Sequence, residues 1–184
     1  MTDNSPLTSK IEYLFKIIGR YDTYITSTNT KASLVIAWNS IVIGTVLLKY
    51  QEIIGSYETA QFARTLIPII LVALGICSAT SIVLIINVIF PFLTSTSKPN
   101  TGRVLIDESA LFFGSVAKLS VAEYEKQIRE LTPSSLLSDL TDQAIILAQG
   151  LNQKMEWIRK SLIVIVIQLV FVVLLFVLKL LLFF

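Results

Sequence analysis

The chain has 184 residues, of which 54% are hydrophobic and only 15% are charged, and its formal net charge is +2. This composition is far more apolar than that of an average soluble domain, and the small net charge gives no support for nucleic-acid binding. The sequence has no histidine and one cysteine, Cys77. A disulfide framework and a cysteine metal cluster are therefore excluded, and the commonest general base is missing.

Three long apolar runs, none with a charged residue inside it, divide the chain: Ala32–Leu48, Leu66–Leu93 and Ser161–Leu178. A helix needs roughly 20 apolar residues to cross a hydrocarbon core about 30 Å thick. The first and third runs hold 17 and 18 residues, and the uncharged stretch around the second is longer than needed. The sequence predicts an all-α integral membrane protein with three transmembrane helices and a cytoplasmic helical bundle.

Residues 1–31 are predicted to form a cytoplasmic amphipathic helix. Ser9 and Glu12 have the spacing of a capping box, and apolar residues then recur at helical intervals. Packing on other cytoplasmic helices is favoured over binding in the membrane interface, because the helix lacks a strongly basic face. The small polar residues of Thr26–Thr30 predict a hinge or short loop before the first span, with a continuous helix as the alternative.

Residues 32–94 are predicted to hold two transmembrane helices joined by a short external loop. The second of them should begin near Pro68, which a first helical turn accepts, and end near Pro91. Three amides lie inside the apolar runs: Asn39, Asn87 and Gln168. Amides in lipid usually hydrogen-bond between helices, and the alternative is that they line a polar path in an oligomer.

Residues 95–160 are predicted to be a cytoplasmic helical region, and residues 161–184 the third transmembrane helix. Thr94–Gly102 has the composition of a linker, and Ser120 with Glu123 forms a second capping box. Thr132-Pro133 has the pattern of an N-cap followed by a first helical residue. The apolar positions that follow continue without interruption, which predicts one long helix from about residue 133 to the C-terminus.

The distribution of basic residues predicts the topology. The loop between the first two runs has only Lys49 and Arg64, whereas residues 1–31 and 94–160 carry most of the other lysines and arginines. By the positive-inside rule the N-terminus and the central segment are cytoplasmic, and the short loop and the C-terminus face outward.

The chain offers one group of residues that could bind a nucleotide monophosphate. Cations, rings and an amide stand together beside the first run: Arg20, Tyr21, Asp22, Tyr24, Asn29 and Lys31. A phosphate needs a cation, a base stacks on a ring, and its polar edge needs an amide or carboxylate. The alternative, which composition alone favours, is an aromatic and basic belt that anchors the protein at the membrane interface.

Two further positions are weaker candidates for the same site. Gly114, within Phe113-Gly114-Ser115, could allow a close backbone approach to a ligand, although a plain turn explains it equally well. Tyr124 could stack on a base, and Lys118, Lys154 and Arg159 are further cations, but each is more often a solvated helix residue. No Gly-rich phosphate loop, nucleophile motif or metal-ligand spacing is present, so no enzyme activity is expected.

Three segments, taken in order, resemble the transmembrane effector family of the Pycsar bacterial anti-phage system. The first runs from Arg20-Tyr21-Asp22-Thr23-Tyr24-Ile25 through Asn29-Thr30-Lys31-Ala32. The second is Phe112–Ala117 with Leu119-Ser120 and Tyr124. The third is Asp139-Leu140-x-x-Gln143 through Leu147-Ala148 and Lys154. The resemblance covers residues from about 9 to 175.

This resemblance implies a membrane effector that works beside a pyrimidine cyclase. The cyclase makes cyclic CMP or cyclic UMP on infection, and the effector senses that ligand and impairs the bacterial inner membrane, which causes abortive infection. No cofactor is implied besides this ligand, and we expect a homo-oligomer, because three spans are too few to enclose a polar pore. The alternative is a constitutive structural or adaptor membrane subunit without ligand gating.

Overall fold

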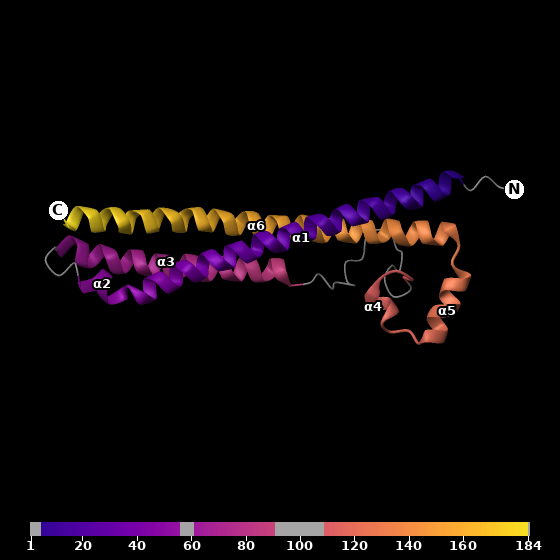
Figure 1. Cartoon of the computed structure of the whole chain (residues 1–184), viewed down its shortest axis with the longest axis horizontal. Helices are drawn as coiled ribbons and strands as arrows, with labels where there is room; N and C mark the ends of the chain where they lie inside the picture. Colours follow the sequence, from indigo (N-terminus) through magenta and orange to yellow (C-terminus); the bar gives the residue numbers. More distant parts are fainter. Residues whose placement is uncertain (1–4, 56–60, 91–108, 184) are drawn as a thin grey trace. The chain divides into compact units, whose positions relative to one another are not determined.

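The computed structural model describes residues 5–55, 61–90 and 109–183. Within these residues every regular element is a helix, as the sequence predicted. Figure 1 labels them: α1 (Ser5–Leu48), α2 (Tyr50–Gly55), α3 (Gln61–Ile89), α4 (Phe113–Val116), α5 (Val121–Glu130) and α6 (Pro133–Phe183). The chain divides into two compact units. The first comprises Met1–Thr26 and Pro91–Asn152, and the second comprises Ser27–Phe90 and Gln153–Phe184.

The first helix is continuous through the segment where a hinge was predicted, so that prediction is wrong. Serine and threonine favour turns when their hydroxyls bond nearby backbone, but here they bond the carbonyl one turn earlier within the helix. Thr26 Oγ1 donates to the carbonyl of Asp22 at 2.9 Å, and Ser33 Oγ donates to that of Asn29 at 3.1 Å. The predicted helix start at Ser9 is also wrong, because Ser9 lies inside α1.

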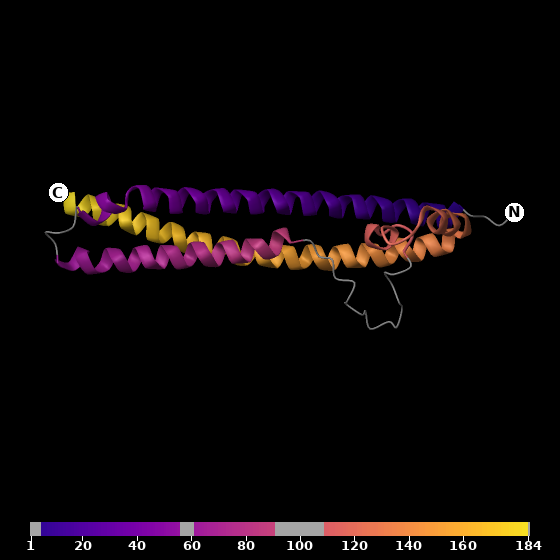
Figure 2. The same cartoon turned by 90° about the horizontal axis from the view of Figure 1, so that it is seen from below.

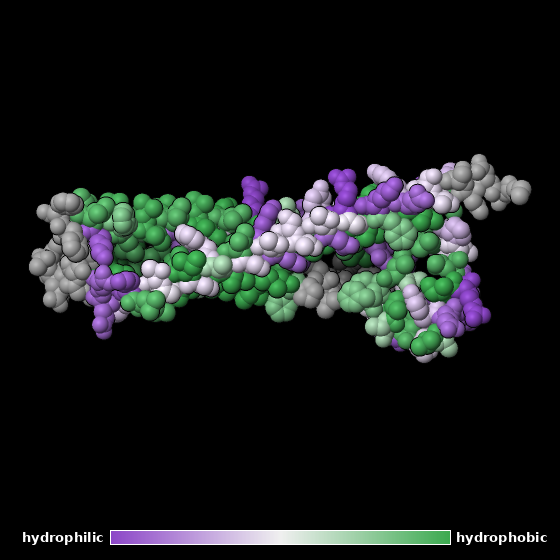
Figure 3. Space-filling model, viewed as in Figure 1, coloured by the Kyte–Doolittle hydropathy of each residue, from purple (hydrophilic) through white to green (hydrophobic). Residues whose placement is uncertain are grey.

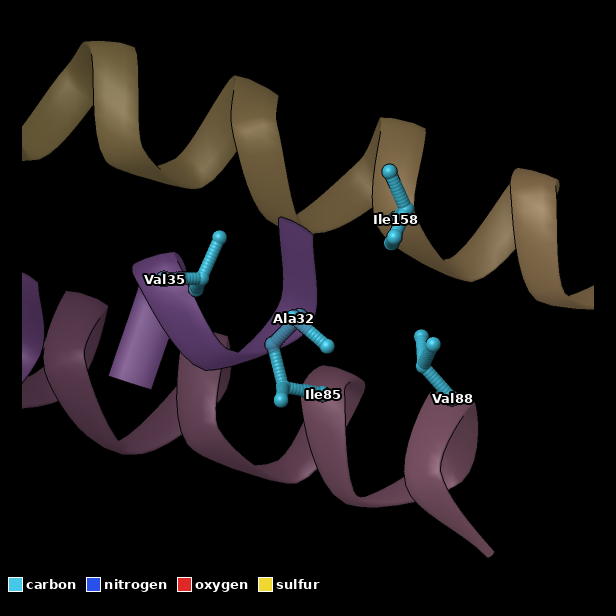
Figure 4. Packing of buried hydrophobic residues seen from close by; sticks show 5 residues of the cluster. All are labelled: Ala32, Val35, Ile85, Val88 and Ile158. Carbon is cyan, nitrogen blue, oxygen red and sulfur yellow. The ribbon is translucent and has the colours of Figure 1, made fainter. Parts of the chain in front are cut away.

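The second unit contains three long helical segments that lie side by side, with α3 antiparallel to those of α1 and α6, and the short helix α2 (Figures 1 and 2). At one level Ala32 and Val35 of α1 pack with Ile85 and Val88 of α3 and with Ile158 of α6 (Figure 4). At another level the buried residues are Val42, Ile70 and Leu74, and Phe171 and Leu175 pack against them. The interior of this unit is therefore built from small and branched apolar side chains of all three helices.

Apolar side chains also cover much of the outside of the second unit, which Figure 3 shows as a mainly green surface. Exposed examples are Leu34 at 67%, Ile76 at 62% and Val166 at 61%. In the described residues three helices are long and apolar enough to cross a membrane. An apolar exterior of this extent is typical of lipid-facing helices, which agrees with the three predicted spans.

The bounds of α3 differ from the prediction at its start. The helix begins at Gln61, so Pro68 lies inside it rather than in its first turn. A proline there cannot donate to the carbonyl of Arg64, but transmembrane helices tolerate such a residue when their neighbours support the backbone. The helix ends at Ile89, close to the predicted end at Pro91. The predicted linker Thr94–Gly102 lies outside the described residues.

Two predicted helix starts are confirmed. Ser120 caps α5, because its hydroxyl accepts from the backbone N–H of Glu123 while the Glu123 carboxylate accepts from the N–H of Ser120 at 2.8 Å. At the start of α6, Thr132 Oγ1 accepts from the N–H of Ser135 at 3.2 Å. The predicted long helix is also present, since α6 runs for 51 residues from Pro133.

Candidate functional site

Four of the predicted ligand residues lie within two turns of α1, in the first unit. The side chains of Arg20, Asp22 and Tyr24 are exposed, and that of Tyr21 is half-buried. Arg20 and Tyr24 are one turn apart and their side chains hydrogen-bond, which raises the pKa of the already protonated guanidinium. A cation and a ring therefore lie side by side on one exposed face, where they could meet a phosphate and a base.

The other two predicted residues on α1, Asn29 and Lys31, belong to the second unit, and both are exposed. Asn29 Oδ1 accepts a hydrogen bond of 3.4 Å from the ammonium of Lys154 on α6. Lys154 itself is buried, with 7% of its surface exposed. The sequence indicated a solvated lysine at this position, but the structure places it inside the helix packing.

Among the described residues of the first unit, a dense polar cluster is centred on Asp139 of α6. Asp139 Oδ1 accepts from Ser109 Oγ at 2.7 Å, and Asp139 Oδ2 accepts from the N–H of Ala110 at 3.1 Å. Gln143 Nε2 donates to Ser109 Oγ at 3.2 Å and to Asp139 Oδ1 at 3.4 Å. Tyr124 of α5 completes the cluster by donating to the carbonyl of Ala110 at 3.2 Å. We call these five residues the Asp139 cluster.

The Asp139 cluster fixes the segment that leads into α4. Ser109 Oγ also accepts from the backbone N–H groups of Leu111 at 3.2 Å and Phe112 at 3.0 Å. One carboxylate and one hydroxyl thus accept hydrogen bonds from several donors of this non-helical segment. Buried donors cost free energy when they are left unpaired, so these bonds stabilise the segment. The hydroxyl of Tyr124, a predicted base-stacking residue, is used to hold this stretch.

Gly114 lies in the short helix α4, and its close neighbour is an aromatic ring. A Cβ at this position would lie 2.6 Å from Cε1 of Phe112, whose ring stands 4.8 Å from that of Phe113. The close approach expected here is therefore made to the Phe112 side chain. A larger residue would push that flexible ring aside.

Two of the three predicted amides join the helices of the second unit. Asn39 Nδ2 of α1 donates to Ser81 Oγ of α3 at 3.1 Å, and Ser81 Oγ lies 3.1 Å from Ser161 Oγ of α6. In a second layer, Gln168 Nε2 donates to Ser78 Oγ at 2.6 Å while Gln168 Oε1 accepts from Trp38 Nε1 at 3.1 Å. Each layer links all three helices.

Asn87, the third predicted amide, behaves differently from the other two. Its side chain is exposed, and its Nδ2 donates to the carbonyl of Val83 in the same helix at 2.8 Å. It makes none of the helix-to-helix bonds expected of it, because it lies on the outer face of α3. In the part of the chain that the structure describes, no group of three acidic or cysteine side chains could hold a metal ion.

The sequence of this chain matches a known protein family. A family model described as the Pycsar effector protein domain matches residues 13–181, nearly the whole chain. The chain belongs to the Pycsar effector family. Searches of curated proteins and of solved structures found no match.

The family match confirms the resemblance identified from the sequence. This Pycsar effector is a membrane protein of an anti-phage system, and its family links it to a cyclic nucleotide signal. The matched residues include the α1 group, the Asp139 cluster and both polar layers of the second unit. The family match therefore covers all of these groups and not a single segment.

Sequence reasoning missed the contacts of four residues that the structure of this Pycsar effector makes prominent: Ser109, Asp139, Gln143 and Lys154. Asp139 and Gln143 are one turn apart on a helix, a spacing that puts both on one face. That spacing was part of the resemblance, but it did not show which residue hydrogen-bonds to Asp139. The partner, Ser109, lies 30 residues earlier in the chain, beyond the reach of a local pattern.

Proposed function

We propose that this Pycsar effector is activated by a cyclic pyrimidine mononucleotide, cyclic CMP or cyclic UMP, and that it then impairs the bacterial inner membrane. The observation that carries the proposal is the family match over residues 13–181, together with three helices able to span a membrane. Loss of the membrane barrier would stop the infected cell before phage mature. The protein acts without catalysis, and a pyrimidine cyclase is its functional partner through the nucleotide product.

The continuity of α6 supports the proposal that ligand binding changes the packing of the membrane spans through this helix. This helix carries Asp139 and Gln143 near its start and Gln168 in its apolar run, without a break between them. A hydrogen-bonded helix resists internal bending, so a displacement at one end is transmitted along its axis. Ligand binding need only favour one packing of the cytoplasmic helices over another to change the packing of the spans.

The α1 group is the proposed ligand site. Arg20 or Lys31 would bind the phosphate, Tyr21 or Tyr24 would stack on the base, and Asp22 or Asn29 would bind its polar edge. Gly114 and Tyr124 remain candidates for the same site. The N-terminus and residues 95–160 would lie in the cytoplasm, where the nucleotide is made, and the C-terminus would lie outside.

The decisive experiment measures membrane potential in bacteria that express this chain, with and without co-expression of a cyclase for cyclic CMP or cyclic UMP. We expect depolarisation with one of the two nucleotides and none with a cyclase for cyclic AMP. Equal potentials under all three conditions would favour the alternative, a constitutive structural or adaptor subunit.

A second experiment tests the ligand residues on α1. The double variant Arg20→Ala, Lys31→Ala should lose both nucleotide binding and toxicity, because it removes both proposed phosphate-binding cations. Lys126→Ala is the matched control, since Lys126 is an exposed lysine of α5 that pairs with Glu130 at 4.0 Å. Unchanged binding in the double variant would show that the site lies elsewhere.

A further inference from the structure

Lys154 occupies an interior position of α6. It lies on the same helix face as Ile158, Ser161 and Gln168, all of which are buried against the other helices of the second unit. Lysine is among the residues least often buried without a partner. An ammonium group at the start of this buried face therefore needs an explanation.

The surroundings of Lys154 leave its charge poorly compensated. Its hydrogen bond goes to a neutral amide, Asn29 Oδ1, at the long distance of 3.4 Å, and no described carboxylate lies within ion-pairing distance of it. Lys154 precedes the third apolar run by seven residues, and burial lowers the pKa of its amine without a counter-charge to oppose that effect. A buried cation without an anion is costly, so an anion that reached it would offset part of that cost.

The residues around this position strengthen the attraction for an anion. Lys31 follows Asn29 by two residues on α1, and Arg159 and Lys160 follow Lys154 on α6, where Glu156 is the one nearby acid. The Lys160 ammonium lies over the Trp157 ring at 4.7 Å from its centroid. The local formal charge is thus positive beside the first and third apolar runs, where a phosphate group can approach from water or from the lipid headgroups.

We propose that Lys154, with Asn29, binds a phosphodiester monoanion. Two sources share this chemistry, the cyclic phosphate of a nucleotide and the phosphate of an anionic phospholipid headgroup. The ammonium would donate to a phosphate oxygen, and the Asn29 amide would rotate to present its N–H₂ group to another. The nucleotide source rests on the proposed function and would place the cyclic phosphate on Lys154 and Asn29 in place of Arg20 or Lys31, whereas the lipid source is independent of it.

The test uses the full chain in nanodiscs, either of phosphatidylcholine alone or with phosphatidylglycerol added. Thermal unfolding of each sample is measured without nucleotide and across titrations of cyclic CMP and cyclic UMP. Lys154→Met removes the charge while it keeps an unbranched apolar side chain, so this variant should fold at least as stably as the natural chain. Lys126→Met is the matched control, because Lys126 is exposed on α5.

A second variant keeps the conclusion independent of the folding of Lys154→Met. Asn29→Asp leaves the lysine in place and supplies a carboxylate beside it, at an exposed position that tolerates a polar residue. The carboxylate would neutralise the ammonium and compete with the ligand. Both variants should bind the anion about tenfold or more weakly, as expected for loss of a charge-assisted hydrogen bond.

Each outcome decides the proposal. A nucleotide-dependent rise in Tm that both variants lose supports Lys154 with the nucleotide as source. A rise in Tm with phosphatidylglycerol but not with nucleotide, lost in both variants, supports Lys154 with the lipid as source. The same result contradicts nucleotide binding and so counts against the proposed function. If nucleotide raises the Tm of the natural chain and of both variants equally, and phosphatidylglycerol has no effect, Lys154 is not the site although the proposed function stands. No response to either anion overturns the proposal.

Discussion

Within the described residues of the first unit the polar contacts between elements gather around Asp139, whereas in the second unit they are spread as separate layers through apolar packing. The Asp139 carboxylate accepts from Ser109, Ala110 and Gln143, and the segment before α4 depends on it. In the second unit the Asn39 and Gln168 layers stand between clusters such as that of Ala32, Ile85 and Ile158.

This difference has a consequence for how each unit responds to mutation. The Ser109 hydroxyl and the Ala110 N–H share the Asp139 carboxylate as their acceptor, so one substitution at Asp139 should release the segment 109–112. The helices of the second unit should remain packed when one polar layer is removed, because the apolar clusters are unaffected. The four substitutions below test this contrast, in order of decreasing expected effect.

Asp139→Ala should have the largest effect. It removes the acceptor of Ser109 and of the Ala110 N–H, and unpaired buried donors each cost about 1–3 kcal/mol. Hydrogen exchange should become fast in residues 109–112 of the variant. Glu156→Ala, at an exposed position of the same helix, should leave that exchange unchanged. Slow exchange in both variants would show that the cluster does not hold the segment.

Gln168→Leu should have a smaller effect on the second unit. It leaves Trp38 Nε1 and Ser78 Oγ without their partner. Each hydrogen bond between transmembrane helices contributes on average about 0.6 kcal/mol, so the loss of both should cost about 1.2 kcal/mol. Reversible unfolding in mixed micelles would measure the loss. Asn87→Leu is the matched control, because Asn87 bonds only its own helix. A loss as large for Asn87→Leu would contradict the assignment of roles.

Ser120→Ala should destabilise α5 locally by about 1 kcal/mol, the usual value for loss of an N-cap. Hydrogen exchange in Val121–Glu130 should increase, while that of α3 should not change. Ser120→Thr preserves both the N-cap acceptor and the hydroxyl that donates to the Glu123 carboxylate at 2.7 Å, and it should behave like the natural chain. Faster exchange in the threonine variant, equal to that of Ser120→Ala, would show that the cap does not stabilise α5.

Glu52→Gln should have the smallest effect, since its ion pairs are exposed. The Lys49 ammonium, 2.6 Å from Glu52, lowers the pKa of this carboxyl, and Lys179 of α6 adds a second contact at 3.6 Å. Because the pKa is lowered in the folded state, the stabilisation is present above the unfolded pKa. It is lost as the pH falls through the folded pKa. A Tm that falls with acid or salt in the natural chain, but less in the variant, would confirm this sign.

The sequence predicted the features that depend on local chemistry. Apolar runs located the three spans because a bilayer requires about 20 such residues in a row, and the Ser120 and Thr132 caps located the starts of α5 and α6. The secondary structure of Thr26–Thr30 was not predictable in the same way. Its hydroxyls can bond backbone either in a turn or within a helix, and propensity does not decide between the two.

The contacts that define the candidate sites depend on residues far apart in the chain. Asp139 meets Ser109 and Lys154 meets Asn29 because helices bring them together, and no spacing in the sequence encodes either pair. The burial of Lys154 was missed for the same reason. Its charge indicated a solvated position, while the buried face of α6 that includes Ile158 and Gln168 is recognised only when the packed helices are seen.

The two tryptophans of this chain make its second unit observable by fluorescence without an added label. Trp38 donates to Gln168 in the middle of the spans, and Trp157 lies beneath the Lys160 ammonium. Repacking of the spans would break the Trp38 hydrogen bond and change the polarity around one indole. A Trp157→Phe variant would therefore report, through the emission of Trp38 alone, the moment at which the three helices separate.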